Sequence, residues 1–139
     1  MLFTEIGIIE QLSRSALEAQ LPDGLIAPHF GVLNHLSRVG DGRTPLEIAR
    51  AFQVPKTTMT HTLAGLQKRG LVEMRPNPND ARSKQVWLTE AGRSLRDGMI
   101  GRLAPGFMDI QTAIPPDKVG DLLQMLQDLR VYLDKRRDT

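Results

Sequence analysis

Apolar residues recur every three to four positions over much of the chain, which is the spacing of one face of an α-helix. This pattern predicts a helix over residues 2–20 and a second helix over about 25–38. The sequence PDG at 22–24 lies between them and GDG at 40–42 follows the second, and both are typical of turns. The first third of the chain is therefore expected to be helical with short interruptions.

The next segment carries the signals of a helix start. Thr44 stands at an N-cap position, Pro45 at the first helical position and Glu47 at the third, which is the arrangement of a capping box. This helix is expected to end near residue 52. Residues 53–55 interrupt the apolar spacing before a further helical pattern runs over about 55–69. Two short helices joined by so short a turn predict a helix-turn-helix.

After residue 70 the apolar spacing changes from helical to alternating, as expected for strands. The alternation covers 72–75 and 85–88, with a turn-rich, charged loop at 76–83 between the two segments. We expect a β-hairpin over about 71–88, a wing in the vocabulary of DNA-binding folds. Trp87 alternates with apolar residues and is expected to pack against a neighbouring helix.

Two more helices are expected in the C-terminal part. Thr89 is a suitable N-cap for a helix over about 90–111, and Pro105-Gly106 inside it predicts a kink or a break. The last helix opens at 115–117 and repeats apolar residues at spacings of three and four, the seam of a coiled coil: Val119, Leu122, Leu126, Leu129 and Leu133. This seam favours dimerisation, and an ordinary core-facing helix is the alternative. The fold class is mainly α with a small β-hairpin (α+β).

Length and composition limit the class of protein. The chain has 139 residues, 40% of them hydrophobic and 4% aromatic, as expected for a single globular domain. It contains no cysteine, which excludes disulfides, thiol catalysis and thiolate metal sites. No apolar run reaches the ~18 residues of a membrane span, and Glu5 and Glu10 stand where a signal peptide would carry basic residues. We therefore expect a cytoplasmic protein without a membrane partner.

The positive charge is concentrated in one segment. The net charge is only +2, but residues 55–84 hold six basic and two acidic residues, a net of +4. Such a segment favours a polyanion by releasing its condensed counterions. On charge alone, a solvated surface is an equally good interpretation.

The sequence offers no constellation for catalysis. Metalloprotease, nucleophile-elbow and phosphate-loop motifs are absent, and the carboxylates are dispersed, so we expect no enzyme, no catalytic residues and no cofactor. His29, His35 and His61 have no spacing that clusters them, so no metal site is expected. The first two are better explained as partly buried residues of the second helix.

Double-stranded DNA binding explains these features together. A helix-turn-helix inserts its second helix into the major groove. With Met59, Leu63 and Leu66 buried, the opposite face of that helix offers hydroxyl, imidazole, amide and ammonium groups, and the wing adds basic groups for the flanking groove. The candidate DNA-binding residues are Lys56, Thr57, Thr58, Thr60, His61, Gln67, Lys68, Arg82 and Lys84.

One of these residues has a second interpretation, and two other residues of the segment need comment. The Thr58 hydroxyl has two alternatives, a phosphate contact or a bond back within its own helix. Asp80 would repel phosphate, so its expected task is to hold Arg82 in place. Gly65, in the middle of the same helix, costs ~1 kcal/mol relative to alanine and has no explanation in the sequence.

Residues 44–92, TPLEIARAFQVPKTTMTHTLAGLQKRGLVEMRPNPNDARSKQVWLTEAG, resemble the winged helix-turn-helix of MarR-family transcriptional regulators. The specific part is Asp80-x-Arg82 followed by Val86-x-Leu88-Thr89. The flanking helices match the family's order of elements more loosely. The chain departs from the pattern at Pro55, His61, Ala81 and Pro105-Gly106.

The resemblance implies a homodimer on a pseudo-palindromic operator and repression relieved by a small aromatic or phenolic effector. It implies a single domain over 1–139, with a DNA-binding lobe at 25–92 and dimerisation helices at 1–21 and 93–139. The alternative from another class is a winged-helix module that binds a protein and no DNA. A metal sensor built on scattered histidines and carboxylates is a third hypothesis.

Overall fold

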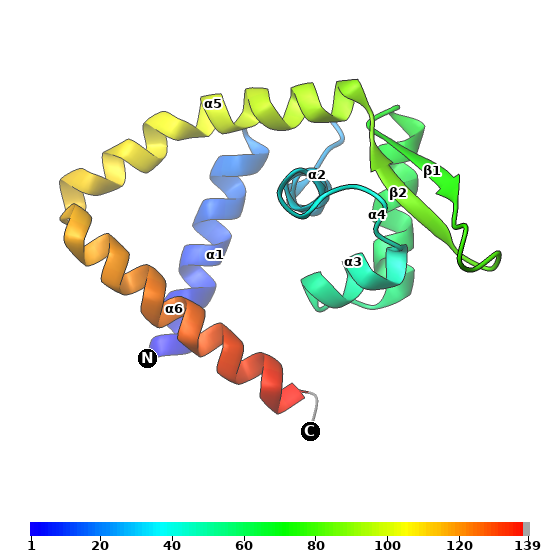
Figure 1. Ribbon diagram of the computed structural model, residues 1–139. Coiled ribbons are helices and arrows are strands. Elements are labelled where there is room, and N and C mark those ends of the chain that lie inside the picture. The colour runs from blue at the N-terminus through cyan, green and yellow to red at the C-terminus, as the bar shows by residue number, and fades with distance from the viewer. Residues whose placement is uncertain (138–139) are drawn as a thin grey trace. The chain divides into compact units, whose positions relative to one another are not determined.

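The computed structural model describes residues 1–137, which form six helices and one two-stranded sheet (Figure 1). In chain order the elements are α1 (Leu2–Glu18), α2 (Ala27–Val39), α3 (Pro45–Phe52), α4 (Lys56–Lys68), β1 (Val72–Pro76), β2 (Lys84–Leu88), α5 (Glu90–Ala113) and α6 (Pro116–Arg137). The prediction of a mainly helical fold with a β-hairpin is confirmed. The chain divides into two compact units, residues 1–102 and the part from 103 on, with the boundary inside α5.

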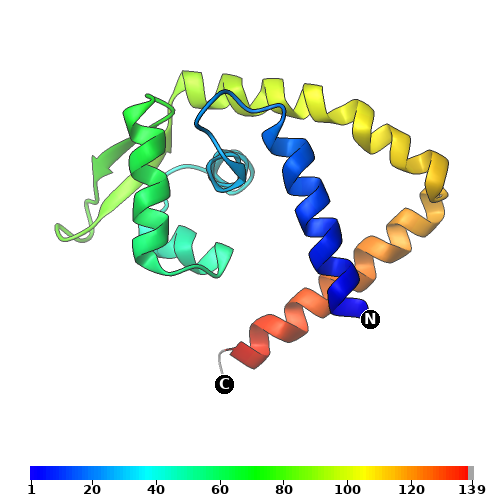
Figure 2. The ribbon, with the colours of Figure 1, turned by 180° about the vertical axis from the view of Figure 1, so that it is seen from behind.

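The core of the first unit lies where α2, α3, α4 and the hairpin meet. The helix α4 contacts α2, α3 and β1, and α2 also contacts β2 (Figure 2). The largest fully buried side chains come from all four parts: Val32, Leu33, Leu36, Ile48, Leu63, Leu66, Val72 and Val86, together with Met99 of α5. Because α4 is buried along one face only, its other face stays in solvent.

The predicted helix ends are confirmed at two positions. The Thr44 side chain accepts a hydrogen bond from the backbone N–H of Glu47 at 3.2 Å and so caps α3. The Thr89 Oγ1 accepts from Gly92 N at 3.0 Å and donates to the Gly70 carbonyl at 2.6 Å. Gly92 is buried, and a Cβ there would overlap the Leu71 carbonyl oxygen. The start of α5 is thereby tied to the end of the helix-turn-helix.

The helix-turn-helix turn uses one left-handed residue. Gln53 follows α3 with φ 60° and ψ 38°, and Val54 N then donates to the Ala49 carbonyl at 3.0 Å. These bonds satisfy carbonyls that the helix end leaves open, as αL caps do elsewhere. The chain can then start α4 within three residues.

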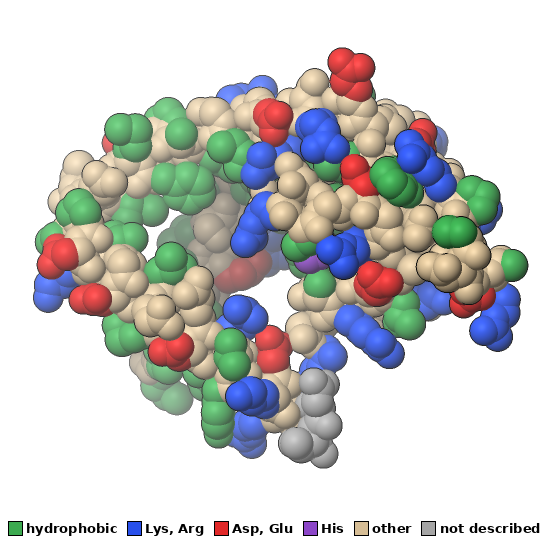
Figure 3. Space-filling model, viewed as in Figure 1, with side chains coloured by type: hydrophobic (Ala, Val, Ile, Leu, Met, Phe, Trp, Pro, Cys, Tyr) green, Lys and Arg blue, Asp and Glu red, His purple; other side chains and the backbone are tan. Residues whose placement is uncertain are grey.

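The second unit is purely helical over the residues described. Pro105 lies inside α5, and the helix continues through it to Ala113, so the break considered from the sequence does not occur. The kink stays a prediction. No residue of α6 (116–137) is buried within the single chain, and hydrophobic side chains lie open along it (Figure 3). The apolar seam of α6 is therefore not covered by a core in one chain.

Candidate nucleic-acid interface

The exposed face of α4 carries the polar residues expected from the sequence. Its buried stripe is Met59, Thr62, Leu63 and Leu66, and the candidate residues Lys56, Thr57, Thr58, Thr60, His61, Gln67 and Lys68 are all exposed. Pro55 occupies the N-cap position and offers no side-chain cap, so the first N–H groups of α4 keep their donors directed outward. This end of the helix combines free donors, hydroxyls and a positive dipole end.

Thr62 was not expected as part of the buried stripe. It is 7% exposed, and its Oγ1 donates to the Thr58 carbonyl at 3.2 Å. The back-bonding considered for Thr58 thus belongs to Thr62, because that hydroxyl faces the core and needs an internal partner. The sequence signal was the threonine at the helical spacing of Met59 and Leu66.

The tip of the wing is ordered by its own side chains. Asn77 Oδ1 accepts from Asn79 N at 2.9 Å, and Asn77 Nδ2 donates to Ser83 Oγ at 3.0 Å across the loop. Asp80 Oδ1 accepts from Arg82 N at 3.0 Å and from Arg82 Nε at 3.3 Å. The Arg82 side chain is 92% exposed, so Asp80 fixes its inner end and leaves the outer end in solvent.

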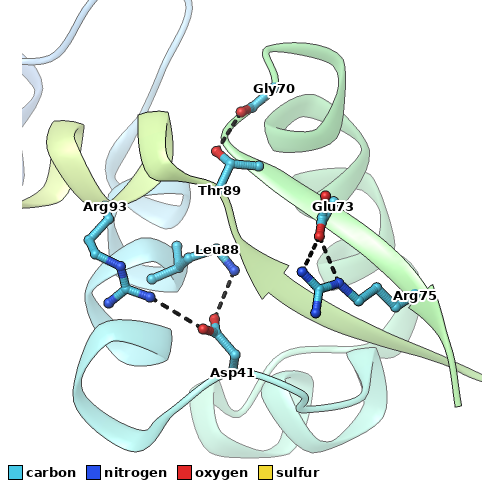
Figure 4. Close-up of polar contacts among 7 residues, drawn as sticks. All are labelled: Asp41, Gly70, Glu73, Arg75, Leu88, Thr89 and Arg93. Atoms are coloured by element: carbon cyan, nitrogen blue, oxygen red, sulfur yellow. Dashed lines mark hydrogen bonds and ion pairs between the residues drawn. The ribbon is translucent and has the colours of Figure 1, made fainter. Parts of the chain in front are cut away.

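The base of the wing is held by the loop between α2 and α3 (Figure 4). Asp41 Oδ1 accepts from Leu88 N at 2.7 Å, and Asp41 Oδ2 lies 3.3 Å from Arg93 Nη2. Arg43 bridges to Val86 in antiparallel fashion, with Val86 N donating to the Arg43 carbonyl at 2.8 Å. The loop thus extends the hairpin by one short segment, which the turn signal GDG did not predict.

Trp87 packs on the outer face of the hairpin. It stands opposite Glu73 in the register, and the Arg75 guanidinium carbon lies 4.1 Å from the centre of its ring. Arg75 also bonds to Glu73, with Nε 2.7 Å from Oε1 (Figure 4). The ring lies against Gly42, whose φ of 89° favours glycine. A loop and an arginine thus contact this indole, and its packing against a helix stays a prediction.

The junction between α2 and the C-terminal half of α4 contains residues that sequence reasoning did not connect. His29 Nδ1 accepts from Ile26 N at 2.9 Å, and its Nε2 is 3.0 Å from the place of a Cβ on Gly65. Arg69, at the end of α4, donates to the Asp23 carbonyl. Burial, and then the positive charges of Arg69 and His61, lower the pKa of His29. As expected, His29 and His35 are half-buried.

A cavity of about 220 Å³ lies beside α2 and α3. It is lined by His35, Val39, Arg43, Glu47 and Ala51. The His35 ring meets the Phe52 ring edge-on at 5.2 Å, and burial, with Arg43 and Arg38, lowers the His35 pKa. The cavity therefore joins an imidazole, a guanidinium and a carboxylate with the apolar side chains of Val39 and Ala51.

Within residues 1–137, no group of three or more His, Asp or Glu side chains is placed to hold a metal ion. Over the same residues, no helix has both the length and the apolar character needed to cross a bilayer.

Comparison with known proteins points to one family. Residues 23–83 match the sequence model of the MarR family. A crystal structure of a mutant MarR from E. coli complexed with operator DNA is 26% identical with a TM-score of 0.81, over 92% of each chain. Wild-type MarR from E. coli in its apo form is also 26% identical, with a TM-score of 0.76, over 93% of this chain and 96% of that chain. The transcriptional regulator BldR from Sulfolobus solfataricus, 21% identical with a TM-score of 0.82 over 94% and 93%, shares the fold.

Proposed function

We propose that this chain, whose residues 23–83 match the MarR family of transcriptional regulators, is a homodimeric repressor of that family that reads a pseudo-palindromic operator and is released by a small molecule. The proposal rests above all on one observation. Every candidate contact residue on α4 and on the wing is exposed, while the opposite side of both elements is buried in the first unit. The operator complex of the similar MarR from E. coli supports the same partner class.

We divide the candidate contacts by chemistry. The hydroxyls of Thr57, Thr58 and Thr60 are short and suit base edges or nearby phosphates at the N-terminal end of α4. Lys56, Lys68 and Lys84 are flexible point charges suited to phosphates. Gln67 and His61 lie on the same exposed face of α4 and offer an amide and an imidazole. Arg82 at the wing tip suits the flanking minor groove.

The homodimer is supported by apolar surface that one chain leaves open. No residue of α1 is buried, and Leu2, Phe3, Ile9 and Leu12 are each at least 60% exposed. On α6 the exposed apolar residues are Leu122, Leu123, Met125, Leu126, Val131, Tyr132 and Leu133. Covering such surface is favourable by ~25 cal/mol for each Å² removed from water. A second copy of the chain would supply matching helices, with dimerisation segments at 1–21 and 93–139 and a lobe at 25–92.

The effector is supported by the cavity beside α2 and α3. An apolar cavity of ~150 Å³ already holds benzene, so about 220 Å³ accommodates one aromatic ring. His35 and Arg43 offer donors to a phenolic oxygen on that ring, and Glu47 offers an acceptor to a phenolic hydroxyl. Because the backbone of Arg43 pairs with Val86 of the wing, a ligand bound beside this residue lies next to a DNA-binding element.

The test is selection of bound duplexes from a randomised pool with the purified protein at moderate salt. Recovery of an inverted repeat with half-sites about one helical turn apart is the expected result. A variant that lacks the two wing charges, Arg82→Ala with Lys84→Ala, should enrich the same repeat more weakly. Failure of the folded protein to enrich any sequence, with and without candidate aromatic ligands, would favour the interaction module.

A further inference from the structure

The contact between His29 and Gly65 joins two elements that a DNA-binding lobe must hold in register. His29 lies in the first turn of α2, and Gly65 lies in the C-terminal half of α4, on the border of its buried stripe. The His29 ring spans the space between them: one nitrogen bonds to the Ile26 N–H, and the other faces Gly65. The ring is thus fixed from the α2 side and limits how close α4 can lie.

The Gly65 position has no backbone need for glycine. It lies inside a regular helix and is not among the residues with positive φ. A Cβ there would meet His29 Nε2 at 3.0 Å, closer than side chains tolerate without moving. Glycine in mid-helix costs ~1 kcal/mol relative to alanine. A side chain at this position would press against the His29 ring, and the absence of that repulsion offsets the cost.

The ring has to be neutral to keep both contacts. Nδ1 accepts a hydrogen bond from Ile26 N, so a proton on Nδ1 would set two donors against each other. The surroundings also disfavour the charged ring. After burial, Arg69 at the end of α4 and then His61 on α4 lower the pKa of His29, and the side chain of Arg69 is held close by the Asp23 carbonyl. On the α1 side, the Glu18 carboxylate is engaged by Ala27 N at 3.0 Å.

We propose that the neutral imidazole of His29 is a positioning residue for the recognition helix α4, and that Gly65 is glycine because this ring occupies the space of a side chain. The proposal rests on the proposed function, since positioning of α4 matters for an operator. Protonation of His29 displaces the ring from Ile26 N and shifts α4, so operator affinity becomes acid-sensitive through this junction. His61 lies on the exposed face of α4, away from this junction.

The experiment is a double-mutant cycle on operator affinity with Gly65→Ala and His29→Asn. Asparagine keeps a short acceptor for Ile26 N but does not reach Gly65. We expect Gly65→Ala to weaken binding about tenfold in the native background and by less than about twofold in the His29→Asn background. His35→Asn is the matched control, because it removes the other half-buried histidine of α2 and should leave the effect of Gly65→Ala unchanged. Equal effects of Gly65→Ala in both backgrounds, or none in either, overturn the proposal.

A second measurement works without DNA. In an NMR titration from about pH 7.5 to about pH 4.5, which extends well below the ordinary histidine pKa of ~6.5 because the pKa of His29 is lowered, the amide signals of Gly65 and Arg69 should move with the ionisation of His29. In His61→Asn that response should persist, and in His29→Asn it should vanish. Amide signals that do not follow His29 overturn the contact itself. A wild-type protein that selects no duplex but shows the NMR response contradicts the proposed function while leaving the junction intact.

Discussion

Replacing Arg82 with alanine tests the DNA-binding role of the wing with little effect on the fold. The side chain is 92% exposed, and its ion pair with Asp80, at 3.3 Å, lies in solvent. Pairs of this kind contribute ~0–1 kcal/mol and are screened by salt. Arg82→Ala is therefore expected to change the free energy of unfolding by less than ~0.5 kcal/mol. Any larger loss of operator affinity then belongs to the contact with DNA.

The size of the effect follows from counterion release. Each phosphate neutralised on duplex DNA contributes ~0.9 to the slope of log affinity against log salt. A dimer with two wings loses two such contacts, so the slope should become less steep by ~1.8. When the salt concentration rises from 50 to 200 mM, the operator affinity of both proteins falls. The factor by which it falls should be about twelve times larger for the native protein than for the variant.

Fluorescence anisotropy of a labelled operator at four or more salt concentrations measures this slope. Arg75→Ala is the matched control, because it removes the same charge from the same hairpin. The Arg75 guanidinium lies over Trp87 and bonds to Glu73, and is thus not directed to DNA. A slope equal to that of the native protein in Arg82→Ala, or equal decreases in both variants, would refute a specific contact of the wing tip.

Three further predictions concern stability and assembly. Gly92→Ala forces a Cβ against the Leu71 carbonyl and should lower the free energy of unfolding by ~1–3 kcal/mol or more, measured by urea denaturation. Leu126→Glu places a charge in the open seam of α6 and should shift the protein towards monomer in sedimentation. Burial lowers the pKa of His29 and of His35 from 6.5, so the unfolded chain binds more protons below that pH, and the melting temperature should fall from about pH 6.5 downward.

Each of these predictions has a control. Gly101→Ala adds a Cβ in open space on the same helix as Gly92 and should not destabilise. Gln127→Glu adds the same charge on an exposed position next to the seam and should leave the dimer intact. The acid-induced loss of melting temperature should shrink when both histidines are replaced by asparagine. If a variant and its control show the same free energy of unfolding, the same oligomeric state or the same loss of melting temperature, the reasoning behind that prediction is contradicted.

The helices and the hairpin could be predicted because local signals determine them. The cap at Thr44, the turn at 53–55 and the change of apolar spacing after residue 70 each lie within a few residues of the structure they produce. The exposed face of α4 follows from the spacing of Met59, Leu63 and Leu66. Contacts between elements could not be predicted, because the partners lie far apart in sequence. Asp41 is 47 residues from Leu88, to which it bonds.

Gly65 is an example of a residue whose role cannot be predicted from its own position in the sequence. In the sequence it is only a cost to helix stability, and no local rule connects it to His29, 36 positions earlier. Its meaning appears when the ring and the missing Cβ are found 3.0 Å apart. Trp87 is a related case, since alternation indicates which side of a strand it occupies and not that Arg75 and Gly42 lie against it.

The wing tip and the junction between α2 and α4 show two ways in which an exposed polar surface is ordered before it binds DNA. A DNA-binding surface must be polar and exposed, so hydrophobic burial cannot order it, and ordering it only on binding would cost affinity. At the tip, Asn77 and Asp80 fix the loop and the inner end of Arg82 by hydrogen bonds within seven residues. At the junction, the His29 ring sets how closely α4 approaches α2. The tip is ordered by amide and carboxylate side chains without a histidine, whereas the junction depends on an imidazole that must stay neutral. Acidification to about pH 5.5 should therefore weaken the reading of bases by α4 before it loosens the grip of the wing on phosphates.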